Sequence, residues 1–260
     1  MAEAKVLLER EGDVAILTLN DPETRNALSW PLALDACDAI DRIGNARALV
    51  ITGAGKGFCS GGDMTSEVPE GFGFGDMIAK GLRDAVNPLV RRIAALKIPV
   101  VAAVNGAAAG AGAPLALHAD FVIAGESAFF YFAFPNVGLA LDAGSSWLMP
   151  RLVGHARAME ALMLAERIPA AKALDWGMIY KVVPDADLLS EAKALATRLA
   201  AGPTVSYGVI RQAVRMGESS TYLDALLVEE EAQRVSGNSN DCAEAVSAFL
   251  EKRAPVFRGE

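Results

Sequence analysis

Short apolar runs alternate with helical repeats along the first half of the chain. Two of these runs flank Gly12, in the turn-forming triplet Glu-Gly-Asp, and predict a β-hairpin. Three further runs are apolar almost throughout, which is typical of strands buried on both faces of a sheet. These three runs cover residues 47–52, 99–106 and 121–125. Because strands alternate with helices, the sequence predicts an α/β fold whose sheet is covered by helices.

Helical periodicity marks the longer segments between these runs. Residues 28–43 carry apolar side chains at helical spacing, with Ser29 as a capping residue and Pro31 suited to the first turn. Residues 75–96 show a similar pattern, and Pro88 predicts a bend or break there. After residue 143 helical patterns prevail, and residues 178–183 are the one clear late strand.

The dipeptide Gly202-Pro203 marks a break between two predicted parts of the chain. Residues 1–201 form the α/β part, and residues 202–260 form a helical part with three amphipathic helices, at 203–217, 221–237 and 241–255. The apolar stripes of these helices need a surface to pack against, which favours self-association.

Composition restricts the classes of function. The chain has 260 residues, 52% hydrophobic and 22% charged, enough for one large domain or a domain with an appendage. A net charge of -8 argues against nucleic acid as a partner. Three scattered cysteines predict a reduced, cytoplasmic protein, and two histidines leave little to build a zinc site. No apolar stretch is long enough for a signal peptide or a membrane span, so we expect no membrane partner.

Two Gly-rich turns follow predicted strands and are candidates for ligand contact. Residues 53–57 do not complete a phosphate-loop pattern, because Gly57 stands where Ser or Thr is required. Residues 58–64 and 110–114 remain, the second with Pro114 suited to a first helical turn. Each turn could direct a backbone N–H group at a shared point, an arrangement that stabilises an oxyanion. Close packing of two elements explains the second turn equally well.

Asp142 is an acidic residue between apolar neighbours, and two interpretations are open. Its carboxylate could cap the helix predicted from residue 144 onward. Alternatively, burial could raise its pKa and make it a general acid or base. Serine hydrolysis is disfavoured because Ser145 lacks the elbow pattern, and His118 and His155 are read as residues at helix ends.

The chain resembles the crotonase superfamily, the enoyl-CoA hydratase/isomerase group, nearly from end to end. The segments that carry the resemblance are DPETRNAL at 21–28, ALVITGAGKGFCSGGDM at 48–64, IPVVAAVNGAAAGAGAPLALHADFVIAG at 98–125, WGMIYKVVP at 176–184 and FLEKRAPVFRG at 249–259. The resemblance implies a spiral of repeated ββα units with a C-terminal helical region for trimerisation, assembled as a homotrimer or a dimer of trimers.

The resemblance also implies a ligand. It is an acyl-CoA thioester, with CoA as part of the substrate and no permanently bound cofactor or metal. The thioester oxygen would accept hydrogen bonds from the N–H groups of Gly62 and Ala111. The residues implied along the CoA-binding strip are Arg25, Ala27, Gly61 and Asp63, and those implied to reach CoA from the C-terminal region, across a subunit boundary or within one chain, are Lys252 and Phe257.

Departures from the family pattern change the expected chemistry. The hydratases carry glutamates where this chain has Pro114 and Asn136. The segment GLALDAGSSW at 138–147 is similar to that of the branch containing the ring-epoxide isomerase of phenylacetate breakdown and related enoyl-CoA isomerases, in which the aspartate is the proposed acid/base. The resemblance therefore favours Asp142 as the catalytic residue, with capping as a compatible second role.

We therefore predict an acyl-CoA isomerase that moves a double bond with a single carboxylate and an oxyanion site. The acyl pocket is predicted from Met64, Phe134, Asn136 and Trp147. Two alternatives are an enoyl-CoA hydratase that uses Asp142 with a water held by Asn136, and a non-catalytic binder of CoA esters.

Overall fold

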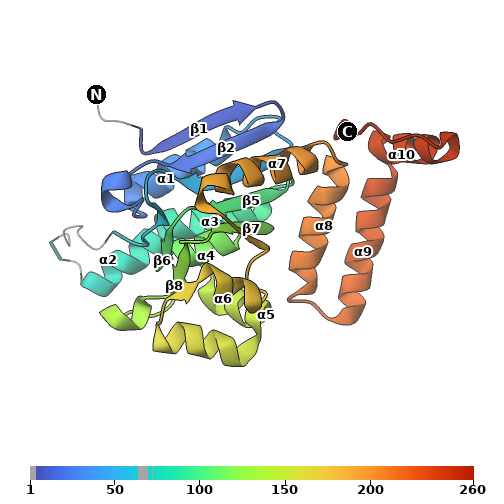
Figure 1. The fold of residues 1–260 in the computed structure, drawn as a ribbon. Helices are drawn as coiled ribbons and strands as arrows, with labels where there is room; N and C mark the ends of the chain where they lie inside the picture. Colours follow the sequence, from blue (N-terminus) through green and yellow to red (C-terminus); the bar gives the residue numbers. More distant parts are fainter. Residues whose placement is uncertain (1–3, 64–69, 72) are drawn as a thin grey trace.

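Two sheets and the helices around them build the main body of the protein, and three C-terminal helices stand beside it (Figure 1). The computed structural model describes residues 4–63, 70–71 and 73–260. The larger sheet has six strands in the order β1 (Val6–Glu11), β2 (Val14–Leu19), β3 (Ala48–Gly53), β5 (Val100–Val104), β7 (Phe121–Gly125) and β10 (Lys181–Val183). The smaller sheet has four, in the order β4 (Gly57–Cys59), β6 (Ala107–Ala109), β8 (Phe129–Tyr131) and β9 (Ile168–Pro169).

The strands follow a repeated ββα order. In each of the pairs β3–β4, β5–β6 and β7–β8, the first strand lies in the larger sheet and the second in the smaller one. Successive first strands are parallel neighbours, and so are successive second strands. The chain therefore winds as a spiral, and the loops that leave β4 and β6 lie side by side.

The helices have the following bounds. In the spiral they are α1 (Trp30–Asp41), α2 (Phe74–Gly81), α3 (Asn87–Ala95), α4 (Gly112–Leu117), α5 (Ser145–Met159), α6 (Ala170–Asp175) and α7 (Leu188–Ala200), and in the C-terminal region α8 (Thr204–Gly217), α9 (Tyr222–Gly237) and α10 (Asn240–Glu251). The shorter turns are η1 (Pro22–Thr24), η2 (Leu82–Val86), η3 (Phe134–Val137), η4 (Glu160–Leu164) and η5 (Asp185–Asp187), of which η2 and η4 are π-helical.

Most of the predicted elements are confirmed. The hairpin forms around Gly12, and Ser29 caps α1 by accepting a hydrogen bond from the N–H group of Leu32. Pro88 does not break its helix: it lies in the first turn of α3, directly after the π-helical turn η2. The late strand is shorter than predicted, because only residues 181–183 pair with β7.

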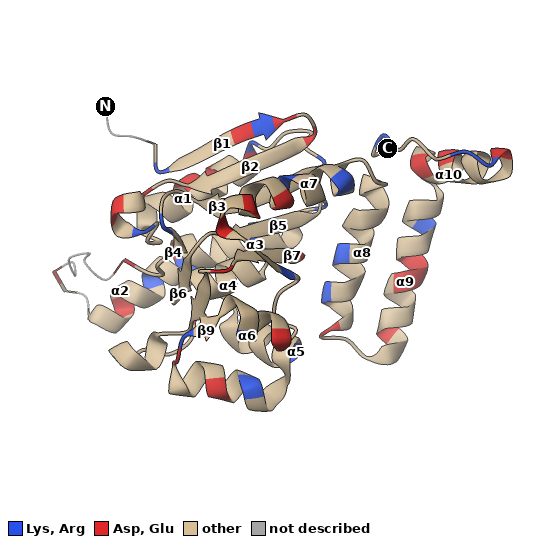
Figure 2. Cartoon of the chain, viewed as in Figure 1, with Lys and Arg blue, Asp and Glu red and all other residues tan. Residues whose placement is uncertain are grey.

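The core lies on both faces of the larger sheet. On one face, side chains of β2, β3 and β5 pack against α7, and on the other the same strands pack against α1, α3 and the smaller sheet. Figure 2 shows charged residues mainly on the outer helices and the hairpin, and β3 and β5 contain none. This all-apolar packing fixes the strand ends from which the site loops leave.

The C-terminal helices are anchored to the spiral through a buried ion pair. Arg211 of α8 is 7% exposed, and its Nε donates to Asp120 at 2.7 Å. Helices α8 and α9 form an antiparallel pair, and α10 lies on the opposite side of the molecule from α2 (Figure 1). No helix within the described ranges is long and apolar enough to cross a membrane.

Candidate active site

The two Gly-rich turns predicted to share a ligand lie in direct backbone contact. They follow β4 and β6, which are parallel neighbours with Cys59 opposite Ala108. A Cβ atom on Gly61 would lie 2.8 Å from the carbonyl oxygen of Ala109, and one on Gly112 would lie 2.3 Å from that of Cys59. Glycine at both positions therefore lets the turns approach more closely than any side chain would allow.

This approach leaves two backbone donors facing one space. The described part of the chain contains no hydrogen-bond acceptor for the N–H group of Gly62 or of Ala111. Both residues line the same cavity. Unpaired N–H groups near a helix start are favourable partners for a carbonyl oxygen that gains negative charge. The geometry therefore agrees with the predicted oxyanion site, whose role stays a prediction.

The cavity that these donors face has a volume of about 540 Å³ and mostly apolar walls. Part of the lining comes from α2 and η2, and another part comes from the segment around η3. Its lining residues are Leu28, Ser29, Trp30, Ser60, Gly62, Asp63, Met77, Ile78, Lys80, Gly81, Leu82, Ala85, Val86, Gly110, Ala111, Ala133, Phe134, Val137, Leu139 and Asp142. A cavity of this size and lining can hold an apolar group of a small-molecule ligand.

Asp142 lies in this cavity with its carboxyl group largely buried. Burial raises the pKa of Asp142 from 3.8 to about 6. Its Oδ1 atom is buried and has no hydrogen-bond partner within the described residues. A carboxyl group with a pKa near 6 can both accept and return a proton at neutral pH.

The capping role considered for Asp142 is not observed for its carboxyl group. The cap of α5 is Gly144, and no side chain accepts a hydrogen bond there. Instead the backbone carbonyl of Asp142 accepts bonds from the N–H and the hydroxyl of Ser145, both at 2.9 Å. The carboxyl group is therefore not used to terminate the helix.

The loop before α1 lies beside the cavity as a continuous strip. The N–H of Leu28 donates to the carbonyl of Gly61 at 2.7 Å, and the N–H of Ser60 donates to that of Arg25 at 3.0 Å. Arg25 is exposed and Ala27 is buried. These contacts place the predicted CoA-strip residues Arg25, Ala27, Gly61 and Asp63 next to one another and to the cavity lining.

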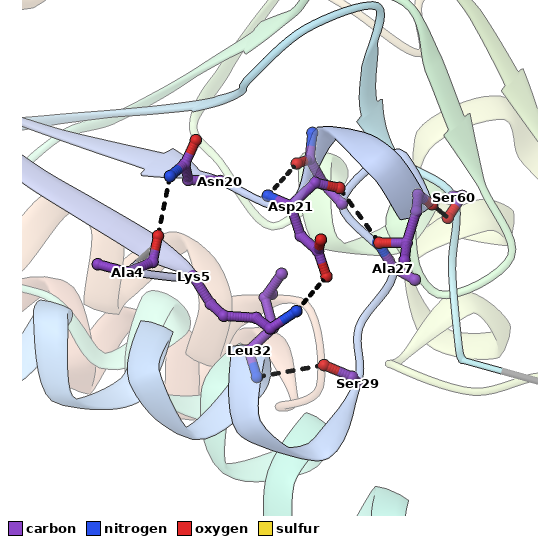
Figure 3. A network of polar contacts seen from close by, with 10 residues as sticks. Ala4, Lys5, Asn20, Asp21, Ala27, Ser29, Leu32 and Ser60 are labelled. Atoms are coloured by element: carbon purple, nitrogen blue, oxygen red, sulfur yellow. Dashed lines mark hydrogen bonds and ion pairs between the residues drawn. The ribbon is translucent and has the colours of Figure 1, made fainter. Parts of the chain in front are cut away.

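Asn26 holds this loop, although nothing in the local sequence pattern indicates this role. Its side chain is fully buried, with Nδ2 donating to the carbonyls of Ala54 and Gly57 at 3.0 and 2.8 Å. Its Oδ1 accepts from the N–H of Asp21 at 2.8 Å, and Lys5 pairs with the carboxylate of Asp21 at 2.6 Å (Figure 3). Its φ of 60° is a conformation that Asn tolerates better than most residues.

The predicted acyl-pocket residues do not all meet in the cavity. Phe134 lines it. Asn136 is exposed and donates to the hydroxyl of Tyr131 at 2.6 Å, outside the lining. Trp147 lines a second cavity near α8, where the guanidinium of Arg151 stacks on its ring at 4.2 Å. Met64 lies outside the described residues.

The two C-terminal residues implied to reach CoA lie away from this cavity. Lys252 is exposed at the end of α10. The carbonyl of Phe257 accepts a hydrogen bond from Arg47 at 3.1 Å. Neither residue lines the cavity, and α10 and the cavity wall α2 are on opposite sides of the chain (Figure 1), so their implied contact with CoA stays a prediction.

Two further lining residues, Trp30 and Lys80, were not predicted, because each lies in a sequence pattern that is typical of an ordinary helix surface. The ammonium of Lys80 lies 4.8 Å from the ring centroid of Trp30, and both line the cavity. Trp30 lies at the start of α1 and is exposed, and a Trp at such a position was the signal that could have identified this pair of lining residues. Within the described ranges, no cluster of three or more His, Cys, Asp or Glu could hold a metal ion.

Comparisons with known proteins define the class to which this fold and site belong. A profile described as Enoyl-CoA hydratase/isomerase matches residues 9–260, so the chain belongs to that family, and the predicted crotonase fold is confirmed. The 1,2-epoxyphenylacetyl-CoA isomerase of Escherichia coli K12 is 43% identical over 98% of both chains. A probable enoyl-CoA hydratase of Rhodobacter capsulatus is 44% identical over 95% of both. The crystal structure of an enoyl-CoA hydratase from Mycobacterium smegmatis matches with a TM-score of 0.91 at 27% identity, covering 98% of this chain and 99% of that one.

Proposed function

We propose that this protein is an acyl-CoA isomerase that moves a double bond by transferring one proton through Asp142. The observation that carries the proposal is a single cavity with a buried carboxyl group and two backbone donors that have no acceptor among the described residues. The coarser assignment, an enzyme of the enoyl-CoA hydratase/isomerase family, follows from the family match.

The proposed reaction has two steps. The thioester oxygen accepts hydrogen bonds from the N–H groups of Gly62 and Ala111, which acidifies the α-proton of a 3-enoyl thioester. The carboxylate of Asp142 takes this proton, and the C–H electron pair moves into the enolate. The enolate then collapses to the 2-enoyl thioester as Asp142 returns the proton to the γ-carbon. The reverse direction uses the same groups, and atoms and charge balance without another reactant.

The positions that would carry hydratase carboxylates support isomerisation over hydration. Pro114 is buried in α4 and has no acidic group. Asn136 is exposed, donates to the hydroxyl of Tyr131 and is not part of the cavity lining, which favours it less as a residue that would hold a water against Asp142. Proton transfer between two carbons needs one base, whereas addition of water needs groups for both the water and the carbon.

The lining of the cavity supports an apolar acyl group, alicyclic or aromatic. The apolar side chains that line it include Phe134, Val137, Leu139, Met77, Leu82 and Val86. The Escherichia coli relative is described as acting on 1,2-epoxyphenylacetyl-CoA, which makes aromatic and ring-epoxide thioesters the first substrates to test. We propose that CoA enters as part of the substrate and that no cofactor is permanently bound.

Hydration is the second candidate, because the Rhodobacter capsulatus relative is described as a probable hydratase. The deciding experiment incubates the enzyme with matched 2-enoyl-CoA and 3-enoyl-CoA esters in H₂¹⁸O. NMR follows the position of the double bond, and mass spectrometry follows uptake of ¹⁸O. Isomerisation without ¹⁸O uptake is expected. Fast hydration that persists in Asp142→Asn would overturn the proposal, and tight thioester binding without any turnover would identify a binder.

We also propose a homotrimer, alone or paired as a dimer of trimers, in the cytoplasm. Apolar side chains of the C-terminal helices are largely exposed in the single chain, among them Tyr222, Leu223, Leu227 and Phe249. Burial of such a surface stabilises an oligomer. Sedimentation equilibrium is expected to give three or six times the 27.2 kDa chain mass, and a monomer at micromolar concentration would contradict this.

A further inference from the structure

We propose that His118 is a positioning residue that holds the turn carrying Asp142, so that the carboxyl group keeps its place in the cavity. This inference rests on the proposed function, in which Asp142 moves the proton. His118 itself does not line the cavity that contains Asp142. It acts through the residue that follows the aspartate.

The turn that carries Asp142 has an unfavourable backbone conformation. Ala143 and Gly144 have φ values of 46° and 84°, and the N–H of Ser145 donates to the carbonyl of Asp142 at 2.9 Å. A turn with positive φ at both central residues suits glycine and asparagine, whereas alanine pays about 1–2 kcal/mol for the left-handed region. Such a conformation persists only where surrounding contacts hold it.

His118 supplies one of those contacts. Its Nε2 atom lies 3.0 Å from the carbonyl oxygen of Ala143. A carbonyl oxygen can only accept, so Nε2 must carry a proton, and in the neutral ring Nδ1 is then unprotonated. The ring also packs against the next residue, because a Cβ atom on Gly144 would lie 3.2 Å from Nε2. The imidazole therefore both bonds the strained residue and limits the turn's movement.

The backbone of His118 is itself fixed from two sides. It ends α4, with its N–H donating to the carbonyl of Pro114 at 3.0 Å. Its carbonyl accepts a hydrogen bond from Arg215 of α8 at 2.8 Å. The imidazole is therefore a rigid support, and it connects the Asp142 turn to the first C-terminal helix.

The protonation state of His118 keeps this support constant over the working pH range. Burial, together with a smaller effect of the positive charge of Arg215, lowers the pKa of His118 to about 4, although the hydrogen bond to the carbonyl of Ala143 acts in the opposite direction. Among the described residues, Nδ1 is buried without a partner, which is consistent with a neutral ring. The ring donates from Nε2 at every pH at which Asp142 is ionised.

The test compares His118→Leu with His118→Gln, two flexible side chains of similar length that differ in the donor. His155→Gln, at the exposed and only other histidine, is the control. His118→Leu is expected to lower kcat for double-bond transfer about tenfold to a hundredfold with KM changed less than about threefold. His118→Gln is expected to restore most of the rate, because its amide can donate to Ala143. In His118→Leu the acid limb of the kcat–pH profile is expected to shift to lower pH than in the wild type. The reason is that a less firmly held Asp142 becomes more exposed to solvent, which lowers the pKa of its carboxyl group.

Two further measurements separate this proposal from the proposed function. In an Asp142→Asn background, His118→Leu is expected to leave the residual rate unchanged, because its effect passes through Asp142. If Asp142→Asn retains full activity, the proposed function fails.

The ¹⁵N spectrum of the imidazoles, assigned with His155→Gln, should show His118 neutral with the proton on Nε2 at pH 6. A proton on Nδ1, or equal kinetics and equal pH profiles for the Leu and Gln variants, would overturn the positioning role.

Discussion

Gly61 and Ala111 meet in backbone contact: a Cβ atom on Gly61 would lie 3.3 Å from the amide nitrogen of Ala111. Gly61 also has a φ of 95°, a conformation that residues with a side chain rarely adopt. This contact places Gly62, the residue after Gly61, beside Ala111, and both of them line the cavity. The proposed oxyanion site thus depends on a residue whose own N–H group is not part of it.

Gly61→Ala is expected to separate the two donor turns. The added methyl would lie 2.8 Å from the carbonyl of Ala109, and the left-handed φ would be strained. We expect kcat to fall by about ten- to a hundredfold and unfolding to become easier by about 2 kcal/mol. Steady-state kinetics and urea titration check both values. For stability the matched control is Gly62→Ala, whose methyl meets nothing within 4 Å. Equal stability of the two variants would contradict the packing argument.

Replacement of Asp142 by Asn is expected to stabilise the protein in a pH-dependent way. The folded pKa of Asp142, about 6, lies above its unfolded value of 3.8, so the folded state binds more protons between these values. Wild-type stability therefore falls as pH rises from about 4 to 6, and the loss remains above pH 6. The variant lacks this loss and should be more stable by on the order of 3 kcal/mol at pH 7.5, with little difference at pH 4. Urea unfolding at both pH values measures the difference. A stability gain that is the same at pH 4 and pH 7.5 would show that ionisation of Asp142 is not its cause.

The pH dependence of the rate follows from the same carboxyl group. Asp142 must be ionised to take the proton, and burial places its pKa at about 6. We expect kcat for double-bond transfer to rise with pH and level off above about pH 7. A rate that is constant between pH 5 and 7 would contradict a base with this pKa, provided that the enzyme stays folded by circular dichroism.

Asn26→Asp is expected to destabilise the loop that lies beside the cavity. The change keeps the shape of the side chain but replaces the amide donor with a carboxylate that faces the carbonyls of Ala54 and Gly57. A loss of about 3 kcal/mol is expected from thermal or urea unfolding, together with weaker thioester binding. The control is Asn20→Asp, since Asn20 donates one exposed bond to the carbonyl of Ala4 (Figure 3). Similar losses for both variants would contradict the structural role of Asn26.

Residue pattern alone predicted the elements that bury apolar side chains along one face or on both faces. The hairpin, the three buried strands and the three C-terminal helices follow from apolar spacing, which burial enforces. The short strands of the smaller sheet were not predicted, because three residues such as Ala107–Ala109 carry no period. Their pairing is decided by the parallel register of the spiral, a long-range effect.

The sequence indicated several residues that line the cavity, whose roles stay predictions, but it gave no sign of the long-range contacts around them. Gly62, Ala111 and Asp142 line one cavity as the sequence and its family resemblance indicated. Trp147 lies elsewhere because α5 directs it toward α8. His118 was read correctly as the end of α4, but its bond to Ala143 joins residues 25 positions apart and has no local signal.

The central claim is that one carboxyl group, Asp142, transfers the proton. The most direct test measures double-bond transfer in a 3-enoyl-CoA ester by the wild type and by Asp142→Asn, with thioester affinity measured by calorimetry. The account predicts that kcat falls at least about a thousandfold while the dissociation constant changes less than about threefold. A variant that moves the double bond at a rate near that of the wild type would contradict it.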